Sequence, residues 1–433
     1  MAAVVDKRPG SWSVPVSRYV SPELFQLERD KLWTRTWQMA CRLEEIPSVG
    51  DFTEYSICDQ SVLLVRSGPD QVRAFGNACR HRATQLATGA GSFRGQRIVC
   101  PFHGWQWDLD GRNTFVYGEQ GFDPECLDSV DLKLREYRVE CWGGCAFINL
   151  DPNARPLEEA LSPIAALLDP LGVDRMRVQW WKCVVLKANW KLAQEAFMEG
   201  FHVMQTHPQL SVGLPDDPDA QVYEVHANGH SHFQNRPGRS QAPAGVDPLE
   251  VAIESSRLLH DGLEAMTLER DMRAIEGLRN HKAAGSLGQN LVQAIYDAAA
   301  AEGVSLPVPD PSAMARWGGV FFIFPNYFVL PQYGNALIYR SRPDGMDPES
   351  CLFELWSVSI PSSGEACERP TRLGPFGPYD ATAWPTIPLQ DFSNIERQQR
   401  GIHTLGFDSM RLSGRYEAGI ANMHRELDRY LGV

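Results

Sequence analysis

Cys79-Arg80-His81-Arg82 and Cys100-Pro101-Phe102-His103-Gly104-Trp105 are the two stretches that decide the fold of this chain. The first contains a Cys-x-His pair and the second a Cys-x-x-His pair, with eighteen residues between them. Cysteine thiolates and neutral imidazoles are ligands for zinc, copper or iron. Because each stretch supplies one ligand of each type, we expect two loops that meet at one metal centre.

The composition indicates an enzyme-sized protein and disfavours a nucleic-acid partner. The chain has 433 residues, 43% of them hydrophobic, which is enough for a large core in two or three domains. Its 54 acidic and 41 basic side chains give a formal net charge of −13, which disfavours nucleic-acid binding. The first residues lack an apolar signal segment, and there is no apolar run of the roughly 18 residues that span a membrane. We therefore expect a soluble, cytoplasmic protein with no membrane contact.

Hydrophobic patterning divides the chain into three parts. Residues 1–49 show apolar residues at helical spacing after Ser21-Pro22, a helix N-cap followed by Pro, and we expect this helical segment to pack on the C-terminal domain. Short alternating strands and tight turns predict a small all-β domain over residues 50–150. Residues 151–433 predict helices around an antiparallel sheet. The predicted class is α+β, with the all-β domain inserted in the larger helix-plus-antiparallel-sheet domain.

Individual elements of the C-terminal part are also predicted. Apolar strands are expected over 318–330, 336–340 and 352–360, and the first is apolar enough to be buried on both faces. Helical spacing is found over 157–168, 190–204, 249–278, 287–301 and 389–431.

Two kinds of metal centre fit the Cys-His stretches. One is a closed Cys2His2 zinc site, but a zinc finger continues into a helix, whereas Gly104-Trp105 leads into another strand. The other is a Rieske [2Fe–2S] centre, in which two cysteines hold one iron and two histidines the other. Histidine ligation raises the reduction potential from about −400 mV to between about −150 and +300 mV. Such a centre stores electrons and passes them on.

These stretches and their surroundings resemble the Rieske non-haem iron ring-hydroxylating oxygenases, in particular their large α subunit. The shared marks include Asn77-Ala78, Arg82 and the turn Asp108-Leu109-Asp110-Gly111, and the resemblance extends from about Arg18 to the C-terminus. It implies two cofactors, a Rieske [2Fe–2S] cluster and a mononuclear Fe(II). The implied cluster ligands are Cys79, His81, Cys100 and His103.

The predicted helix from Asn189 carries Glu199, His202 and His207. At 100° per residue Glu199 and His202 share a face, while the two histidines lie about 140° apart. An unbroken helix could not point both histidines at one metal, so it has to widen or end between them, and Pro208 shows the backbone leaving the helix. By itself, a His pair at this spacing is not a metal motif.

The resemblance gives these residues roles. In the similar oxygenases the pattern N-W-K…E…H-x-x-x-x-H supplies both histidines of a 2-His-1-carboxylate iron site, which implies His202 and His207 as ligands. The implied third ligand is Asp391, in the run that starts at Gln390, although the residues alone make Asp391 a helix N-cap after Pro388. Two imidazoles and one carboxylate hold Fe(II) on one side and leave positions open for dioxygen.

Glu199 is the implied catalytic link between the two centres. In these oxygenases an acidic residue three positions before the first histidine joins it to a cluster histidine of a neighbouring subunit, which here would be His103. That arrangement implies a homotrimer. The residues alone also fit a solvated helix carboxylate. The best-known dioxygenases more often have Asp at this position, and Ala196 stands where many members have Asn.

The activity that the resemblance implies is that of a terminal oxygenase in a multicomponent system, with or without a small β subunit. It would use O2 and electrons from NAD(P)H, passed on by a reductase or ferredoxin, to hydroxylate or dihydroxylate an aromatic or similarly apolar substrate, as in aromatic hydrocarbon catabolism. One alternative is a Rieske monooxygenase or oxidative demethylase. Others are a pure electron carrier and a zinc-stabilised non-catalytic binding protein.

A third group of metal-binding residue types is His226, His230 and His232. These histidines could ligate a further metal. Their spacing by two in a polar segment fits strand or pocket-lining residues better.

Overall fold

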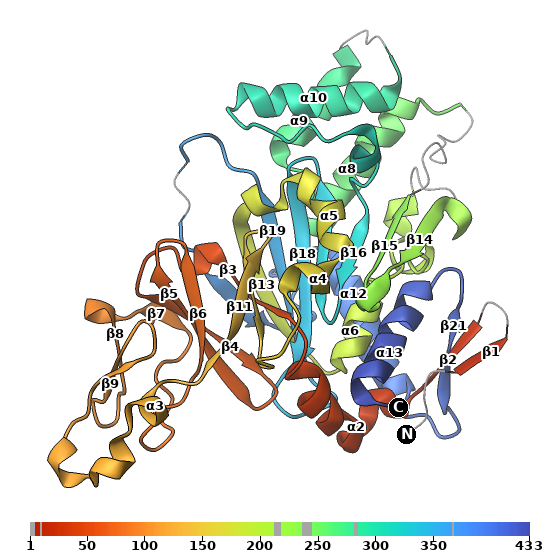
Figure 1. Ribbon diagram of the computed structural model, residues 1–433. Coiled ribbons are helices and arrows are strands. Elements are labelled where there is room, and N and C mark those ends of the chain that lie inside the picture. The colour runs from red at the N-terminus through yellow and green to blue at the C-terminus, as the bar shows by residue number, and fades with distance from the viewer. Residues whose placement is uncertain (1–4, 9–10, 212–217, 236–244, 281–284, 366–367) are drawn as a thin grey trace. The chain divides into compact units, whose positions relative to one another are not determined.

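The computed structural model describes residues 5–8, 11–211, 218–235, 245–280, 285–365 and 368–433 (Figure 1). The chain forms two compact units. Unit 1 comprises Met1–Glu28, Leu161–Ala366 and Arg372–Val433, and unit 2 comprises Arg29–Ala160 and Cys367–Thr371. Unit 1 mixes helices with a mainly antiparallel sheet and unit 2 is mostly β, which confirms the α+β class. Among the described residues, no helix is both long and apolar enough to cross a membrane.

Unit 2 is built on a seven-stranded sheet with the order β3-β12-β11-β6-β5-β4-β7, and a small β10-β9-β8 sheet lies in the same unit. Alternate residues such as Leu63 and Val65 in β5 point into a core that also contains Phe75 and Trp107. The strands are β3 (Gln38–Arg42), β4 (Asp51–Ile57), β5 (Gln60–Gly68), β6 (Gln71–Gly76), β7 (Ala90–Ser92), β8 (Arg97–Val99), β9 (Gln106–Asp108), β10 (Asn113–Phe115), β11 (Glu136–Trp142) and β12 (Cys145–Asn149).

Unit 1 is organised by an eight-stranded sheet with the order β14-β15-β16-β17-β18-β19-β13-β20. Its strands pair antiparallel, except that β20 runs parallel to β13. A second, three-stranded sheet has the order β1-β2-β21. The strands are β1 (Val5–Arg8), β2 (Ser11–Pro15), β13 (Arg177–Leu186), β14 (Gln221–Val225), β15 (Ser231–Asn235), β16 (Val320–Ile323), β17 (Tyr327–Gln332), β18 (Asn335–Pro343), β19 (Cys351–Ser359), β20 (Arg372–Phe376) and β21 (Ser409–Ser413).

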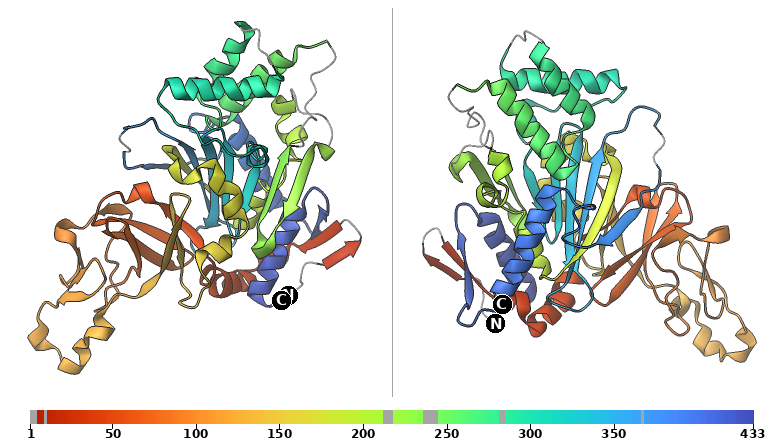
Figure 2. Two further views of the ribbon diagram at one scale, coloured as in Figure 1. Left: turned by 45° about the horizontal axis from the view of Figure 1, so that its top comes forward. Right: turned by 180° about the vertical axis from the view of Figure 1, so that it is seen from behind.

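Helices of unit 1 cover the eight-stranded sheet and position the site. Helix α6 lies against β18 and β19, and α12 lies against α6 and α8. Helices α8, α9 and α10 form a group beyond one end of the strands (Figures 1 and 2). The helices are α1 (Ser17–Val20), α2 (Pro22–Leu27), α5 (Ile164–Leu168), α6 (Trp190–Glu195), α7 (Val203–Thr206), α8 (Pro248–Leu263), α9 (Glu269–Gly277), α10 (Leu287–Ala301), α11 (Pro311–Met314), α12 (Thr386–Gly401) and α13 (Ala418–Leu431). Helix α3 (Ser129–Leu132) belongs to unit 2, and α4 (Leu157–Leu161) lies where the chain passes from unit 2 to unit 1.

The N-terminal segment differs from its prediction. Helical structure after Ser21 ends in a π-helical turn at Trp33, and residues 38–42 form β3 instead of continuing as helix. All five residues of β3 are buried, and the strand pairs with β12 in the sheet of unit 2. Residues 29–49 therefore lie in unit 2, which begins at residue 29 and not at the predicted residue 50. Unit 2 also extends past residue 150 and includes Arg369, whose guanidinium donates to Phe52 O at 2.9 Å.

Several predicted elements are divided in the structure. The helix predicted over 157–168 is interrupted between α4 and α5, and that over 249–278 forms α8 and α9. The apolar run 318–330 is a hairpin of β16 and β17, buried as expected. The C-terminal region contains β21 between α12 and α13.

Gly111 offers a stability test of unit 2. Its φ is +78°, and an added Cβ would lie 2.6 Å from Phe75 Cε1 in the core. We expect Gly111→Ala to lower the free energy of unfolding by about 2–4 kcal/mol, since the left-handed backbone and the overpacking both cost energy. Gly95→Ala is the matched control, because Gly95 has φ +61° but no atom within 4 Å of its added Cβ. Urea unfolding followed by the cluster's visible circular dichroism would measure both, and equal losses would contradict a steric cause.

Candidate metal centres

The two Cys-His stretches form neighbouring loops of unit 2. Cys79 and His81 follow β6, and Cys100 and His103 lie between β8 and β9. Each loop closes in a tight turn, with Ala83 N donating to Cys79 O at 2.9 Å and Gly104 N to Cys100 O at 3.0 Å. Both cysteines belong to the core, with 4% and 2% of their surfaces exposed, while both histidines are half-buried. Thiols therefore lie inward and imidazoles outward.

The four donor groups fit a two-iron cluster better than a single zinc ion. Nδ1 of His81 lies 3.2 Å from Nδ1 of His103, and the His81 ring stacks on Trp105 with centroids 4.8 Å apart. Burial raises the pKa of the Cys79 thiol, and the adjacent Cys100 thiol raises it further. No three of the four residues bring their ligand atoms within 4.8 Å of one another. A tetrahedral zinc ion needs all four within bonding reach of one point, whereas a [2Fe–2S] cluster separates the thiolate pair from the imidazole pair.

The second predicted site is assembled where the helix after Asn189 breaks. Helix α6 ends at Glu195, and a separate short helix, α7, starts after His202 and ends before His207. His207 has non-helical backbone angles of φ −121° and ψ 59°. The predicted end of the helix between the two histidines is therefore present, at His207, and a second interruption, which was not predicted, separates α6 from α7. Because the backbone leaves the helix at His207, the angle of about 140° that a continuous helix would impose does not apply.

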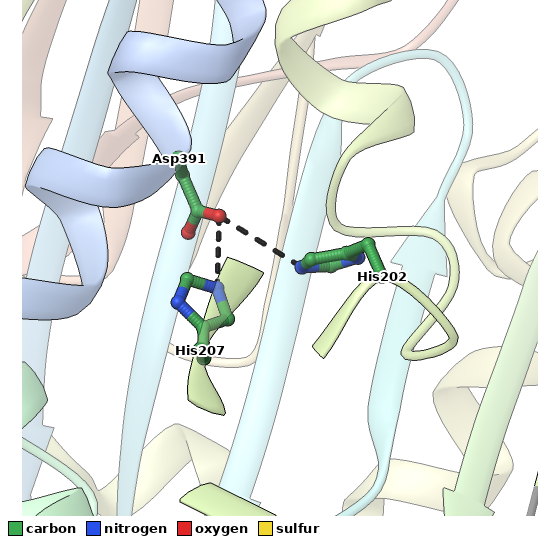
Figure 3. A group of neighbouring side chains, drawn as sticks. All are labelled: His202, His207 and Asp391. Atoms are coloured by element: carbon green, nitrogen blue, oxygen red, sulfur yellow. Dashed lines mark ion pairs between the residues drawn. The ribbon is translucent and has the colours of Figure 1, made fainter. Parts of the chain in front are cut away.

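The structure brings His202, His207 and Asp391 together, as Figure 3 shows. Nε2 of His207 lies 3.0 Å from Asp391 Oδ1, and Nε2 of His202 lies 3.8 Å from the same oxygen. Asp391 is 3% exposed and is the sixth residue of α12, so the expected helix N-cap is wrong. Two imidazole nitrogens and one carboxylate converging on one point are the donor set of a 2-His-1-carboxylate Fe(II) site.

Each histidine is oriented by a hydrogen bond from its other ring nitrogen. His202 Nδ1 lies 2.7 Å from Glu199 Oε1, and His207 Nδ1 lies 2.7 Å from Gln390 Oε1. Because Nδ1 is used in this way, Nε2 of each ring is left for the metal. Although burial lowers the pKa of His202, the hydrogen bond and charge of Glu199 outweigh it and raise the pKa. The other Glu199 oxygen accepts the backbone N–H groups of Phe201 and His202.

Gln390 supports the site by orienting His207, a role for which the sequence carries no local signal. We expect Gln390→Leu to weaken Fe(II) retention about 10–100-fold, as is usual when a partner of a metal ligand is removed. Gln209→Leu is the control, since Gln209 donates to Gln390 Oε1 at 2.8 Å and accepts from Gln390 Nε2 at 3.3 Å, and the loss of both bonds keeps the bond of Gln390 to His207. Fe(II) dissociation constants would be measured for both, and equal retention would contradict the assigned role.

A cavity of about 220 Å³ adjoins these ligands. Its wall carries four acidic side chains, Glu195, Glu199, Asp391 and Glu417, together with His202. Burial raises the pKa of Glu417 to about 7, and the charge of Glu199 contributes to the rise. The cavity offers space beside His202 and Asp391. The remaining lining residues are Ala196, Thr206, Asn394, Ile395, Gln398, Met410, Leu412 and Ile420.

The third histidine group has the geometry of a hydrogen bond. Nε2 of His226 lies 2.8 Å from Nδ1 of His232, with ring planes 6° apart and centroids 5.0 Å apart. The two nitrogens therefore point at each other, and Glu224 lies on the far side of His232, 3.9 Å from its Nε2. His230 instead accepts a hydrogen bond from Phe324 N. These contacts fit strand residues better than a further metal site.

Comparison with known families matches both units. Residues 36–117 match the family model described as the Rieske [2Fe-2S] domain, and residues 173–432 match the ring hydroxylating alpha subunit (catalytic domain). The second match covers more than half of the chain. This chain belongs to the Rieske ring-hydroxylating oxygenase α subunits. The two matched domains imply a Rieske [2Fe–2S] cluster and a mononuclear iron, and the donor sets of this α subunit fit both.

Two curated relatives are glycine betaine monooxygenase oxygenase subunits. The one from Chromohalobacter salexigens is 31% identical over 428 residues, covering 97% of this α subunit and 86% of the relative. The one from Pseudomonas aeruginosa is 32% identical over 211 residues, covering 48% of each chain. The α subunit thus aligns with only about half the length of the Pseudomonas relative.

Two solved structures share the fold of this α subunit. A quaternary ammonium Rieske monooxygenase in complex with L-carnitine has a TM-score of 0.66 and 18% identity, covering 97% of this chain and 95% of that one. Naphthalene 1,2-dioxygenase from Rhodococcus sp., bound to indole, has a TM-score of 0.66 and 19% identity, covering 97% and 94%. The fold of this α subunit is therefore found in both a monooxygenase and a dioxygenase.

Proposed function

We propose that this α subunit is the terminal oxygenase of a cytoplasmic multicomponent system. The observation that carries the proposal is the convergence of His202, His207 and Asp391 beside a cavity. When bound there, Fe(II) supplies the site at which O2 is activated. A separate unit holds Cys79, His81, Cys100 and His103, the proposed ligands of the electron-storing cluster. Electrons from NAD(P)H would arrive through a reductase, with or without a ferredoxin.

The substrate class that we propose is a small methylated quaternary ammonium compound, oxidised by one oxygen atom. Support comes from the glycine betaine monooxygenase subunit that matches 97% of this chain. Hydroxylation of an N-methyl group releases formaldehyde and a demethylated amine.

Aromatic hydroxylation is the second candidate. The 2-aminobenzenesulfonate 2,3-dioxygenase α subunit of an Alcaligenes species is 29% identical over 257 residues, which favours it.

Turnover with two substrate panels tests these proposals. The protein, reduced and supplied with O2, is offered glycine betaine and carnitine in one panel, and naphthalene and anthranilate in the other. Formaldehyde formed in step with O2 consumption supports the first candidate, whereas a ring diol supports the second. A reduced Rieske EPR signal without oxidation of any compound in a broader panel would favour the pure electron carrier. His202→Ala is the control. It should keep the reduced Rieske EPR signal and form no product, and product formed by this variant would have to come from the cluster.

We also propose a homotrimer in which Glu199 faces His103 of the partner subunit. Its support is that Glu199 already binds His202 and lies in the cavity wall. A small β subunit is compatible with this assembly. Sedimentation of the purified α subunit alone would show whether it forms a trimer without a second chain.

A further inference from the structure

A carboxyl, a phenol and an imidazole form a closed group inside unit 1. Glu195 is 5% exposed, and Tyr19 and His424 are both fully buried. Tyr19 Oη donates to Glu195 Oε1 at 2.9 Å, and His424 Nε2 lies 2.8 Å from the same oxygen. Tyr19 Oη and His424 Nε2 are 3.1 Å apart. The three residues come from α1, α6 and α13, so only the tertiary fold assembles them.

Glu195 also borders the oxygenase site. It is the last residue of α6, where the chain leaves the helix for the segment that carries His202 and His207. The cavity wall contains Glu195 together with His202 and Asp391. The same carboxyl residue thus touches the buried group on one side and the cavity on the other.

The nearby cations are already paired with other carboxylates. Lys191 Nζ lies 2.6 Å from Glu28 Oε1, and Arg18 pairs with Asp428. Within the part of the chain that the structure describes, neither a lysine nor an arginine pairs with Glu195. Its carboxyl therefore lacks the partner that would stabilise a buried negative charge.

Charge and burial determine which member of this group holds a proton. Burial raises the pKa of Glu195 to about 8; Glu417 adds to the rise, while the Tyr19 hydrogen bond, Lys191 and Arg18 lower it. Burial, with Arg18 and Lys191, holds the pKa of His424 well below its usual value. Near pH 7, Glu195 is therefore mostly protonated and His424 is neutral.

Hydrogen-bond geometry places the carboxyl proton away from the imidazole. His424 Nδ1 is buried without a hydrogen-bond partner, so its ring hydrogen is best placed on Nε2, which then donates to Glu195 Oε1. Tyr19 donates to the same oxygen at 2.9 Å. The proton of the carboxyl is left on Oε2, whose contact with Tyr19 Oη is longer at 3.1 Å.

We propose that Glu195 is a proton donor to the oxygenase site, held by Tyr19 and His424 as positioning residues. The inference rests on the proposed oxygenase function. Insertion of one oxygen atom into a C–H bond, with reduction of the other to water, consumes one O2, two electrons and two protons. Glu195 supplies one of these protons by breaking its Oε2–H bond. The carboxylate then regains a proton from water in the cavity.

Infrared spectroscopy and single turnover test the proposal with Glu195→Gln, whose amide oxygen still accepts from Tyr19 and His424. The wild type should show a protonated-carboxyl C=O band that disappears as the pH rises through about 8. The band should be absent in Glu195→Gln. The rate of product formation in a single turnover should fall about 10²-fold, within the usual range of general acid catalysis. Iron content and the reduced-cluster EPR signal should be unchanged.

Glu417→Gln is the matched control, because it removes another carboxyl of the same cavity. It should keep the Glu195 band, which then disappears at a lower pH than in the wild type because the Glu417 charge no longer raises the Glu195 pKa. An identical band in the wild type and Glu195→Gln, or a wild-type rate of product formation in Glu195→Gln, would overturn the proposal. The infrared measurement needs no substrate, so failure to find a substrate would count against the proposed function and leave the test of Glu195 intact.

Discussion

Glu199→Gln is expected to leave both metal centres occupied and to slow electron transfer from the cluster to the mononuclear iron by about 10²-fold, the upper scale for partners of metal ligands. The amide keeps one oxygen for His202 but loses the negative charge and the second acceptor oxygen. In the structure both oxygens are used, one by His202 Nδ1 at 2.7 Å and the other by His202 N at 2.9 Å. Rapid-mixing oxidation of the reduced cluster by O2 with substrate would measure the rate.

The charge-matched control for this variant is Glu224→Gln. Glu224 is an exposed carboxylate of unit 1 that faces His232 instead of His202. Its replacement should leave the rate of cluster oxidation within about twofold of the wild type, as surface charges usually contribute little. Cluster oxidation at the wild-type rate in Glu199→Gln would refute the assigned link.

Asp391→Ala is expected to remove the mononuclear iron and reduce product formation to background while the Rieske EPR signal persists. Asp391 Oδ1 is the point on which both histidines converge, at 3.0 and 3.8 Å. Without it, two neutral imidazoles face a divalent cation with no compensating charge. Iron analysis should fall from three to two per chain, because the [2Fe–2S] cluster remains.

Asn394→Ala provides the comparison on the same helix. Asn394 lines the same cavity and bonds to Thr206 Oγ1 at 3.3 Å, but it is not part of the converging donor set. The Asn394→Ala variant should retain three irons per chain. Retention of all three by Asp391→Ala would rule out the carboxylate as an iron ligand.

The ligand types and the two loops of the first centre could be predicted because they depend on residues adjacent in the sequence. Alternating strands and tight turns on both sides of Cys79 and Cys100 predict loops, and the structure has them. The inward cysteines and outward histidines follow from packing in the core of unit 2. That packing depends on residues from many strands and could not be read from the two stretches alone.

Asp391 shows where local rules fail. Pro388 suggested a helix starting nearby, but proline is tolerated in the first turn, and α12 starts at Thr386. Asp391 therefore lies inside the helix, facing a histidine 184 positions earlier in the chain. From the sequence, only the resemblance to the oxygenases indicated that Asp391 and His207 share a site. Gln390, which orients the same histidine, has no local signal of its role.

The second histidine pair was only partly predictable. Helical angles showed that the helix needed an interruption, but not that it would begin after Glu195. Strand β14 and the parallel pairing of β20 with β13 were not predicted, and the histidine spacing indicated a strand near β15 without its pairing to β14. These elements gain their stability from sheet neighbours distant in sequence, so their own residues carry a weak signal.

Helix α7 has only four residues, between His202 and His207. A helix of this length has no stability of its own in water. Its ends are tied down by the two histidines, whose ring nitrogens face a carboxylate on α12. An ion bound at these three side chains would therefore act as a clip between α7 and α12. Iron binding and the folding of α7 would then be one coupled equilibrium. In the protein without iron, α7 would be partly unfolded, and His202 and His207 would be less well positioned.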